Sequence, residues 1–192
     1  MNANYLLAAL ILSLPLSGCS NLISAGREAP IQEDHGSRTM GSYVDDELIE
    51  TKARVNLLEA EEMLQGASVG ITSFNGLVLL TGQAPSEGVR QHIEQIVGQL
   101  RKVRRIHNEI SLSGTVSTLA TASDTWLSLK AKSQLLADNQ APGNRIKVVT
   151  ENGTVYLMGL VTQAEASAAT TVISNISGVQ KIVKIFEYID QP

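Results

Sequence analysis

The side chains that most often carry out chemistry are sparse in this chain of 192 residues, which contains one cysteine and three histidines. His35, His92 and His107 are isolated from one another in the sequence, whereas a metal site needs several ligands in converging positions. No nucleophile is paired with a base, and no glycine-rich loop opens a helix with a lysine. We therefore expect no catalytic residues, no metal and no cofactor, and we interpret the chain as a non-enzymatic protein.

Cys19 is the exception, because it ends an apolar segment near the start of the chain. Residues 5–16 are almost all apolar, and a stretch of this length is too short to span a bilayer as a helix but suits the core of a signal peptide. The motif Leu16-Ser17-Gly18-Cys19 resembles the bacterial lipobox. That resemblance implies cleavage before Cys19 and acylation of its thiol, with a diacylglycerol and usually a third acyl chain.

Acylation at Cys19 predicts where the protein resides. Each buried CH₂ is worth about 0.8 kcal/mol, so two or three acyl chains anchor a protein stably. Ser20 follows the cysteine in place of the Asp that often retains lipoproteins at the inner membrane. We expect the periplasmic face of the outer membrane. An ordinary cleaved signal peptide with a free cysteine is the alternative, and the first four residues carry no Lys or Arg.

A second candidate site lies between Trp126 and Leu136, where the periodicity predicts a helix with two apolar stripes. At about 100° per residue, one stripe faces the core of its own domain, and the second lies on nearly the opposite side. No acidic residue occurs in this segment. An apolar stripe with a Trp and flanking lysines is typical of a helix at a membrane interface. The second stripe and its flanks comprise Trp126, Leu129, Lys130, Lys132, Ser133 and Leu136.

A duplicated domain must position these residues. The sequence Asn75-Gly76 and the apolar run after it recur 77 residues later as Asn152-Gly153 and a second apolar run. A repeat of this length is too long for a solenoid unit. Asn-Gly between two apolar runs predicts a hairpin, because both central residues of a type I′ turn need positive φ.

Each copy is expected to fold as α-β-β-α-β, an α+β unit with a three-stranded mixed sheet. A right-handed crossover would make the last strand parallel to the second, and both helices would cover one face. The predicted segments are a signal peptide (1–18), a lipidated N-terminus and tether (19–42), the first copy (43–112), a linker (113–122) and the second copy (123–192).

The first helix of each copy is expected to begin at acidic residues, which are favourable at helix N-termini. Asp45 and Asp46 mark this start in the first copy, and Ser123-Asp124 marks it in the second.

This arrangement resembles the BON domain, and a lipobox, a tether and two such units together resemble the dual-BON outer-membrane lipoproteins of Gram-negative bacteria. The stretch from Asp124 through Lys130 and the segments Thr150-Glu151-Asn152-Gly153 and Leu157–Thr162 are especially similar to that group. The resemblance implies a role in envelope integrity and binding of anionic phospholipid through the second domain.

The two copies differ in charge. Residues 43–112 contain 7 basic and 10 acidic residues, a net charge of −3, whereas residues 123–190 contain 6 of each. The first copy carries an equivalent stripe of Leu48, Thr51, Val55 and Leu58, but among acids that an anionic membrane would repel. These electrostatics predict membrane contact for the second copy. The net charge of −4 and the aromatic content of 4% argue against a nucleic-acid partner.

An exposed apolar helix face is also typical of a protein interface. The alternatives are packing on the other domain or on a dimer mate, and an adaptor role toward outer-membrane assembly or cell-division proteins. The basic run Arg101-Lys102-Arg104-Arg105 is interpreted as a solvated loop, and a contact with anionic headgroups or a partner protein stays open.

Overall fold

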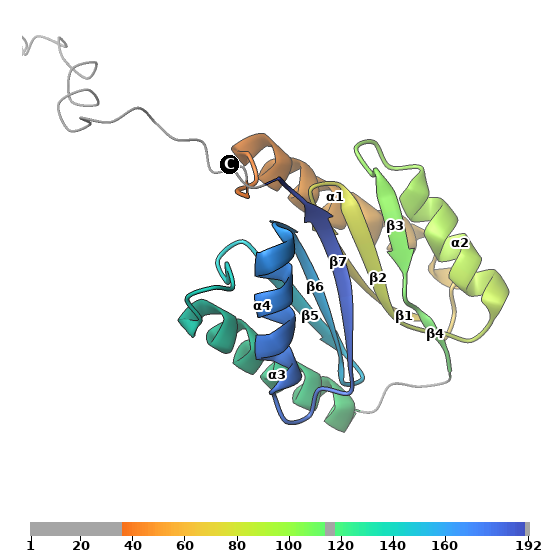
Figure 1. Cartoon of the computed structure of the whole chain (residues 1–192). Coiled ribbons are helices and arrows are strands. Elements are labelled where there is room, and N and C mark those ends of the chain that lie inside the picture. Colours follow the sequence, from red (N-terminus) through yellow and green to blue (C-terminus); the bar gives the residue numbers. More distant parts are fainter. Residues whose placement is uncertain (1–35, 114–117, 191–192) are drawn as a thin grey trace, which may run out of the picture. The chain divides into compact units, whose positions relative to one another are not determined.

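The computed structural model describes residues 36–113 and 118–190, which fold as two α-β-β-α-β copies (Figure 1). These residues belong to one compact unit, residues 34–192. The predicted signal peptide, Cys19 and His35 lie outside the described residues, together with most of the predicted tether and residues 114–117 of the predicted linker.

The first copy forms a mixed sheet in which β2 is central. Its elements are α1 (Met40–Glu59), a short 3-10 helix (Glu61–Met63), β1 (Ser68–Phe74), β2 (Leu77–Ala84), α2 (Glu87–Gly98), β3 (Arg105–Asn108) and β4 (Ser111–Leu112). Strand β1 pairs antiparallel to β2, and β3 pairs parallel to β2. The short strand β4 also pairs parallel to β2, so this sheet has four strands where three were expected.

The second copy has the predicted three-stranded mixed sheet. Its elements are α3 (Thr118–Ala137), β5 (Lys147–Glu151), β6 (Thr154–Val161), α4 (Gln163–Ser174) and β7 (Lys181–Tyr188). Strand β6 is central, with β5 antiparallel and β7 parallel to it. Both predicted turns are present, because Asn75, Gly76, Asn152 and Gly153 all have positive φ.

In each copy the two helices cover one face of the sheet. The core of the first copy joins Ile49 and Ala53 of α1 to Ile93 of α2 and to Val78 and Leu80 of β2. The core of the second copy is built in the same way: it joins Leu127, Ala131 and Leu135 of α3 to α4 and β6. The predicted core stripe of the α3 helix is therefore confirmed.

The opposite faces of the two sheets pack on each other. Successive side chains of β2 and β6 point to opposite faces of their sheets. Leu79, Tyr156 and Met158 therefore point away from the helices and meet in a third apolar cluster. Both central strands are consequently buried on two faces, which is why their sequences are continuous apolar runs. The cluster consists of Phe74, Leu77, Leu79, Tyr156, Met158 and Ile185.

Polar contacts between the copies flank this apolar cluster. Lys147 of β5 donates to Glu50 Oε1 of α1 at 2.8 Å. Arg104, just before β3, donates to Glu187 Oε2 of β7 at 3.1 Å. Asn75 Nδ2 donates to the same Glu187 oxygen at 2.7 Å. The Asn-Gly turn of the first copy is thus a docking point for the last strand of the second.

The expected helix starts are wrong in both copies, and the acids predicted there have another role. Helix α1 begins at Met40 and α3 at Thr118, within the predicted tether and linker. Asp46 is therefore inside a helix and only 2% exposed, where it accepts hydrogen bonds from the backbone N–H groups of Asn75 (2.7 Å) and Gly76 (2.9 Å).

The second copy repeats this contact between helix and turn. Asp124 accepts from the backbone N–H groups of Asn152 (2.7 Å) and Gly153 (2.9 Å). A turn with two residues at positive φ leaves these N–H groups directed outward, and one carboxylate satisfies both. Each copy therefore fastens its hairpin to its first helix through an aspartate.

We predict that Asp46→Asn lowers the free energy of unfolding by about 1–3 kcal/mol, because the two N–H groups donate to different carboxylate oxygens and an amide replaces one of these oxygens by an NH₂ donor. The measurement is urea unfolding of residues 34–192. Asp45→Asn is the matched control, since its carboxylate makes an exposed ion pair with Lys102 and should cost less than about 1 kcal/mol. Equal losses in the two variants would contradict the assigned contact.

The same variant should change the response to acid. Burial opposes ionisation of Asp46, but hydrogen bonds from Gly76, Ser73, Asn75 and Arg38 outweigh it and hold its pKa below the ordinary value of 3.8. A lowered folded-state pKa stabilises the fold above the unfolded value, and this contribution is lost as the pH falls through the folded value. Stability of the parent should therefore fall more steeply below pH 3.8 than that of Asp46→Asn.

We predict that Leu79→Ala lowers the free energy of unfolding by about 2–5 kcal/mol, because it leaves a cavity between the two sheets. The β7 amides, in the other copy, should lose hydrogen-exchange protection together with those of β2. Leu112→Ala is the control, because Leu112 is 54% exposed. Loss of protection confined to the first copy would show that the interface does not couple the two sheets.

Candidate functional site

Helix α3 exposes the second apolar stripe predicted from its sequence. Trp126 is 56% exposed, Leu129 68% and Leu136 57%, whereas Leu127 and Leu135 of the core stripe are buried. Ser133 is also exposed. The structure thus brings four of the six predicted phospholipid-binding residues onto one outward face. We call Trp126, Leu129, Ser133 and Leu136 the α3 outer face.

Lys130 lies at the edge of the α3 outer face, against Trp126. Its Nζ lies 4.8 Å from the centre of the Trp126 ring, within the range of a cation–π interaction. The contact holds a positive charge beside the largest apolar side chain of the face. An indole and an ammonium in contact suit a boundary where one side is apolar and the other is charged.

Lys132 is placed differently, because its ammonium points into the loop after α3. Its Nζ donates to the backbone oxygens of Gly143 (2.6 Å) and Ile146 (2.7 Å). Burial lowers the pKa of this amine. The geometry favours a structural role for Lys132 in fastening residues 143–146 to α3, rather than attraction of an anionic surface.

Helix α1 also exposes its stripe. Leu48 is 47% exposed, Val55 47% and Leu58 64%, because the apolar cluster between the two copies is built from their sheets and does not include these residues. Packing of the first copy's stripe on the second copy, one of the alternatives, is therefore wrong. What separates α1 from α3 is the presence of acids: Glu47 and Glu59 are exposed beside this stripe together with Lys52 and Arg54, whereas α3 has no acid from Trp126 to Leu136.

A groove between α3 and the edge strand β5 was missed from the sequence. It has a volume of about 240 Å³. Burial, and then the charge of Asp124, raise the pKa of Glu151 at this groove. No single motif marks such a groove, because its residues come from two elements. We call it the α3–β5 groove, and its lining comprises Thr121, Asp124, Thr125, Ser128, Val148, Val149, Thr150 and Glu151.

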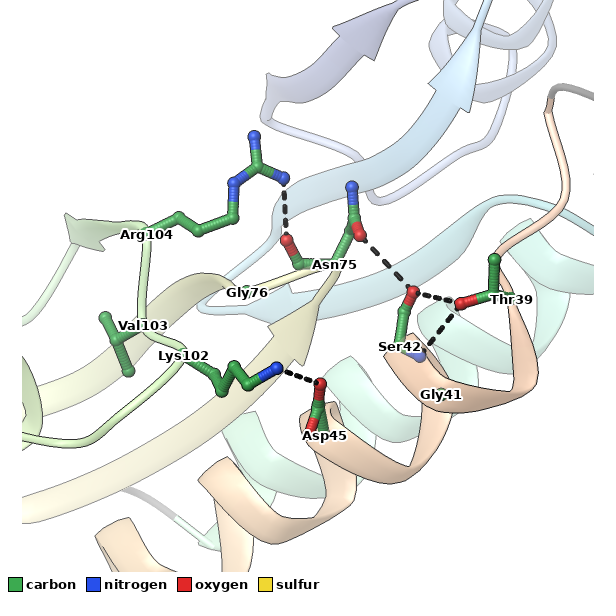
Figure 2. Close-up of a pocket in the computed structure, with 9 residues that line it drawn as sticks. All are labelled: Thr39, Gly41, Ser42, Asp45, Asn75, Gly76, Lys102, Val103 and Arg104. Atoms are coloured by element: carbon green, nitrogen blue, oxygen red, sulfur yellow. Dashed lines mark hydrogen bonds and ion pairs between the residues drawn. The ribbon is translucent and has the colours of Figure 1, made fainter.

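A larger cavity of about 410 Å³ lies where α1, the Asn75-Gly76 turn and the loop before β3 meet (Figure 2). The basic run reaches it, but its cations there are paired. Lys102 Nζ lies 3.2 Å from Asp45 Oδ2, and Arg104 donates to the Asn75 carbonyl oxygen at 2.9 Å as well as to Glu187. This part of the basic run therefore joins structural elements.

Across residues 36–113 and 118–190, no helix is both long and apolar enough to cross a membrane. The same residues contain no group of three or more histidine, cysteine or acidic side chains that could hold a metal ion.

Comparison with known proteins gives relatives that span nearly the whole chain. The chain is 34% identical over 176 residues to the outer membrane lipoprotein DolP of Haemophilus influenzae, covering 91% of each protein. It is 33% identical over 163 residues to a 21 kDa hemolysin of Actinobacillus pleuropneumoniae, covering 81% of this chain and 84% of the relative. Osmotically-inducible protein Y of Escherichia coli is 25% identical over 186 residues, covering 92% of this chain and 91% of the relative.

The BON domain matches the chain twice, over residues 45–114 and 123–190. These ranges contain the two Asn-Gly hairpins, both sheets and both pairs of helices, apart from the first residues of α1 and α3. The chain therefore belongs to the BON domain family and carries two BON domains.

Proposed function

We propose that this protein is an outer-membrane lipoprotein, anchored at Cys19, that maintains the bacterial envelope by binding anionic phospholipid through the α3 outer face. The DolP relative is named an outer membrane lipoprotein and matches this chain over 91% of its length, which supports the location. The lipobox-like motif before Cys19 supports the anchor.

One observation carries the lipid contact: exposed Trp126, Leu129 and Leu136 lie on one face with Lys130 against the Trp ring. Full burial of a large apolar side chain contributes about 1.5–3 kcal/mol, and partial insertion contributes less. A lysine near an anionic surface adds about 1 kcal/mol. An acyl anchor raises the local concentration of the face, so that a weak contact suffices.

Charge favours the second copy over the first. The outer stripe of α1 has similar exposure but lies between Glu47 and Glu59, whereas α3 has no acidic residue from Trp126 to Leu136. An anionic bilayer would repel the acids beside the first face, and no acid opposes its contact with the second.

An adaptor that binds proteins of outer-membrane assembly or cell division is the second candidate. Its support is that both helices present an apolar face outward, and such a face also suits a protein partner.

We predict that Trp126→Glu weakens binding of residues 34–192 to phosphatidylglycerol-containing vesicles by about tenfold or more, because a carboxylate in place of the largest apolar side chain of the face resists insertion and repels the headgroups. The measurement is vesicle cosedimentation at low salt. Leu48→Glu is the matched control, since Leu48 occupies the equivalent position of α1, and it should bind as the parent does.

Circular dichroism would establish that both variants keep the fold. Absence of binding by the parent at low salt would overturn the lipid proposal and leave the adaptor. Equal losses in the two variants would overturn the assignment to α3.

We predict opposite behaviour of the two lysines. Lys130→Gln should weaken vesicle binding about threefold to fivefold and reduce its salt dependence, because a positive charge on the flank of the face is removed. Lys132→Gln should leave the salt dependence unchanged but lower the free energy of unfolding by about 1–2 kcal/mol, because two carbonyl oxygens lose a charged donor. The measurements are cosedimentation across a salt series and urea unfolding. A salt dependence that changes only in Lys132→Gln would reverse the assigned roles.

A further inference from the structure

The α3–β5 groove lies beside the α3 outer face. Thr125, next to Trp126, forms one rim of the groove, and the edge strand β5 forms the other. The groove and the face are thus neighbouring parts of one exposed surface. A molecule held by the outer face would present its polar end near the groove.

The groove is suited to a hydrogen-bond donor. Its polar lining consists of hydroxyl groups and of the carboxylates Asp124 and Glu151, and no lysine or arginine of residues 36–113 or 118–190 lines it. Asp124 is occupied by the Asn152-Gly153 turn, whereas hydroxyl and carboxylate oxygens elsewhere in the lining can accept hydrogen bonds. Like charge excludes a phosphate from this groove, whereas an ammonium group fits it.

The first copy shows what occupies the equivalent place. Glu50 and Ser73 of that copy correspond to Ser128 and Thr150 of the second. Glu50 Oε1 accepts from the Ser73 backbone N–H at 2.8 Å. The ammonium of Lys147 enters between the helix and the edge strand and donates to Glu50 Oε1 at 2.8 Å and to the Ser73 carbonyl oxygen at 3.2 Å.

The second copy lacks this occupant. Lys147 is supplied to the first copy by β5 of the second, and the described part of the first copy places no lysine in the α3–β5 groove. The helix carboxylate is also replaced: Ser128 Oγ donates to Thr150 Oγ1 at 2.8 Å, and the acid at the groove is Glu151 on the strand. The same fold therefore holds an ammonium group in one copy and presents an open, acid-lined groove in the other.

We propose that the α3–β5 groove binds the primary ammonium group of a phospholipid headgroup, that of phosphatidylethanolamine. This inference rests on the proposed membrane contact of α3, because the outer face delivers headgroups to the groove. An ethanolamine ammonium carries three N–H donors, as Lys147 does, whereas choline carries none and is wider. Lys130 lies on the other flank of the outer face, so that anionic headgroups meet one flank and ammonium groups the other.

The state of Glu151 agrees with this assignment. Its pKa is raised first by burial and then by the negative charge of Asp124. A cation in the groove would offset both effects, because it supplies the opposite charge that the protein does not provide there.

The test compares residues 34–192 on two kinds of vesicle with the same fraction of phosphatidylglycerol. The remaining lipid is phosphatidylethanolamine in one and phosphatidylcholine in the other. We expect binding about threefold to fivefold tighter to the ethanolamine vesicles, the effect of one partly exposed charge-assisted hydrogen bond. Equal binding to both would overturn the inference and leave the proposed function intact.

Two variants separate the groove from general effects of ethanolamine lipids on bilayer packing. Glu151→Gln should lose the preference and keep parental binding to the choline vesicles. Ser128→Glu, which restores the carboxylate that Glu50 provides in the first copy, should increase the preference. Asp190→Asn, an exposed acid outside the groove lining, is the control and should keep the parental preference. A preference that survives unchanged in Glu151→Gln would overturn the groove as its origin.

A soluble probe tests the groove without a bilayer. Glycerophosphoethanolamine should shift the amide resonances of Ser128 and Thr150, and glycerophosphocholine should not. If the parent binds neither vesicle, the proposed function fails, and selective shifts would still support the ammonium site. Absence of selective shifts would overturn it.

Discussion

Burial of the two sheets against each other is the interaction on which the rest of the structure depends. A three-stranded sheet with helices on one face leaves its other face open to water, and here Leu79 of one sheet and Met158 of the other close that face for both copies. Each copy is near the lower size limit for an independent core, so the shared cluster adds apolar burial that neither has alone. Because the inner faces are used in this way, helices α1 to α4 lie on the outer faces of the sheets (Figure 1). The exposure of α1 and α3 follows directly.

The polar contacts around this interface differ between the two copies, although their folds are similar. The second copy extends Lys147 into the first, where Glu50 and the Ser73 carbonyl receive it. The Asn75-Gly76 turn of the first copy, held by Asp46, accepts the end of β7 through Glu187. The α3–β5 groove receives no such side chain from the described residues of the first copy, because its lining comes from the second copy alone. A duplicated domain has thus satisfied one of two equivalent sites internally and left the other open.

Sequence reasoning identified what depends on local pattern and missed what depends on contacts between distant residues. The Asn-Gly turns and the stripe of Leu127, Ala131 and Leu135 were correct, because turn geometry and helical periodicity are local. The helix starts were wrong, because Asp46 and Asp124 bind turns 29 and 28 residues later instead of capping helices. Their similar spacing before each Asn-Gly was a usable signal. Burial of β2 and β6 on both faces could also have been inferred from their continuous apolar runs. The contact of Lys132 with two carbonyl oxygens left no such signal.

The comparison of α1 with α3 explains why duplication can divide labour without a change of fold. Because the two sheets pack on each other, the outer stripes of α1 and α3 both point away from the interface between the copies. Neither stripe can pack on the other, and each must face water or a partner. Exposure does not distinguish them, since Leu58 and Leu136 are similarly accessible. Charge does: acids flank the stripe of α1, whereas Lys130 stacks on Trp126 of α3. Near an anionic surface the acids beside the α1 stripe oppose contact, whereas α3 has no acid from Trp126 to Leu136. Apolar burial would attract either face to a bilayer, and in the proposed membrane contact the acids beside α1 leave α3 as the favoured face.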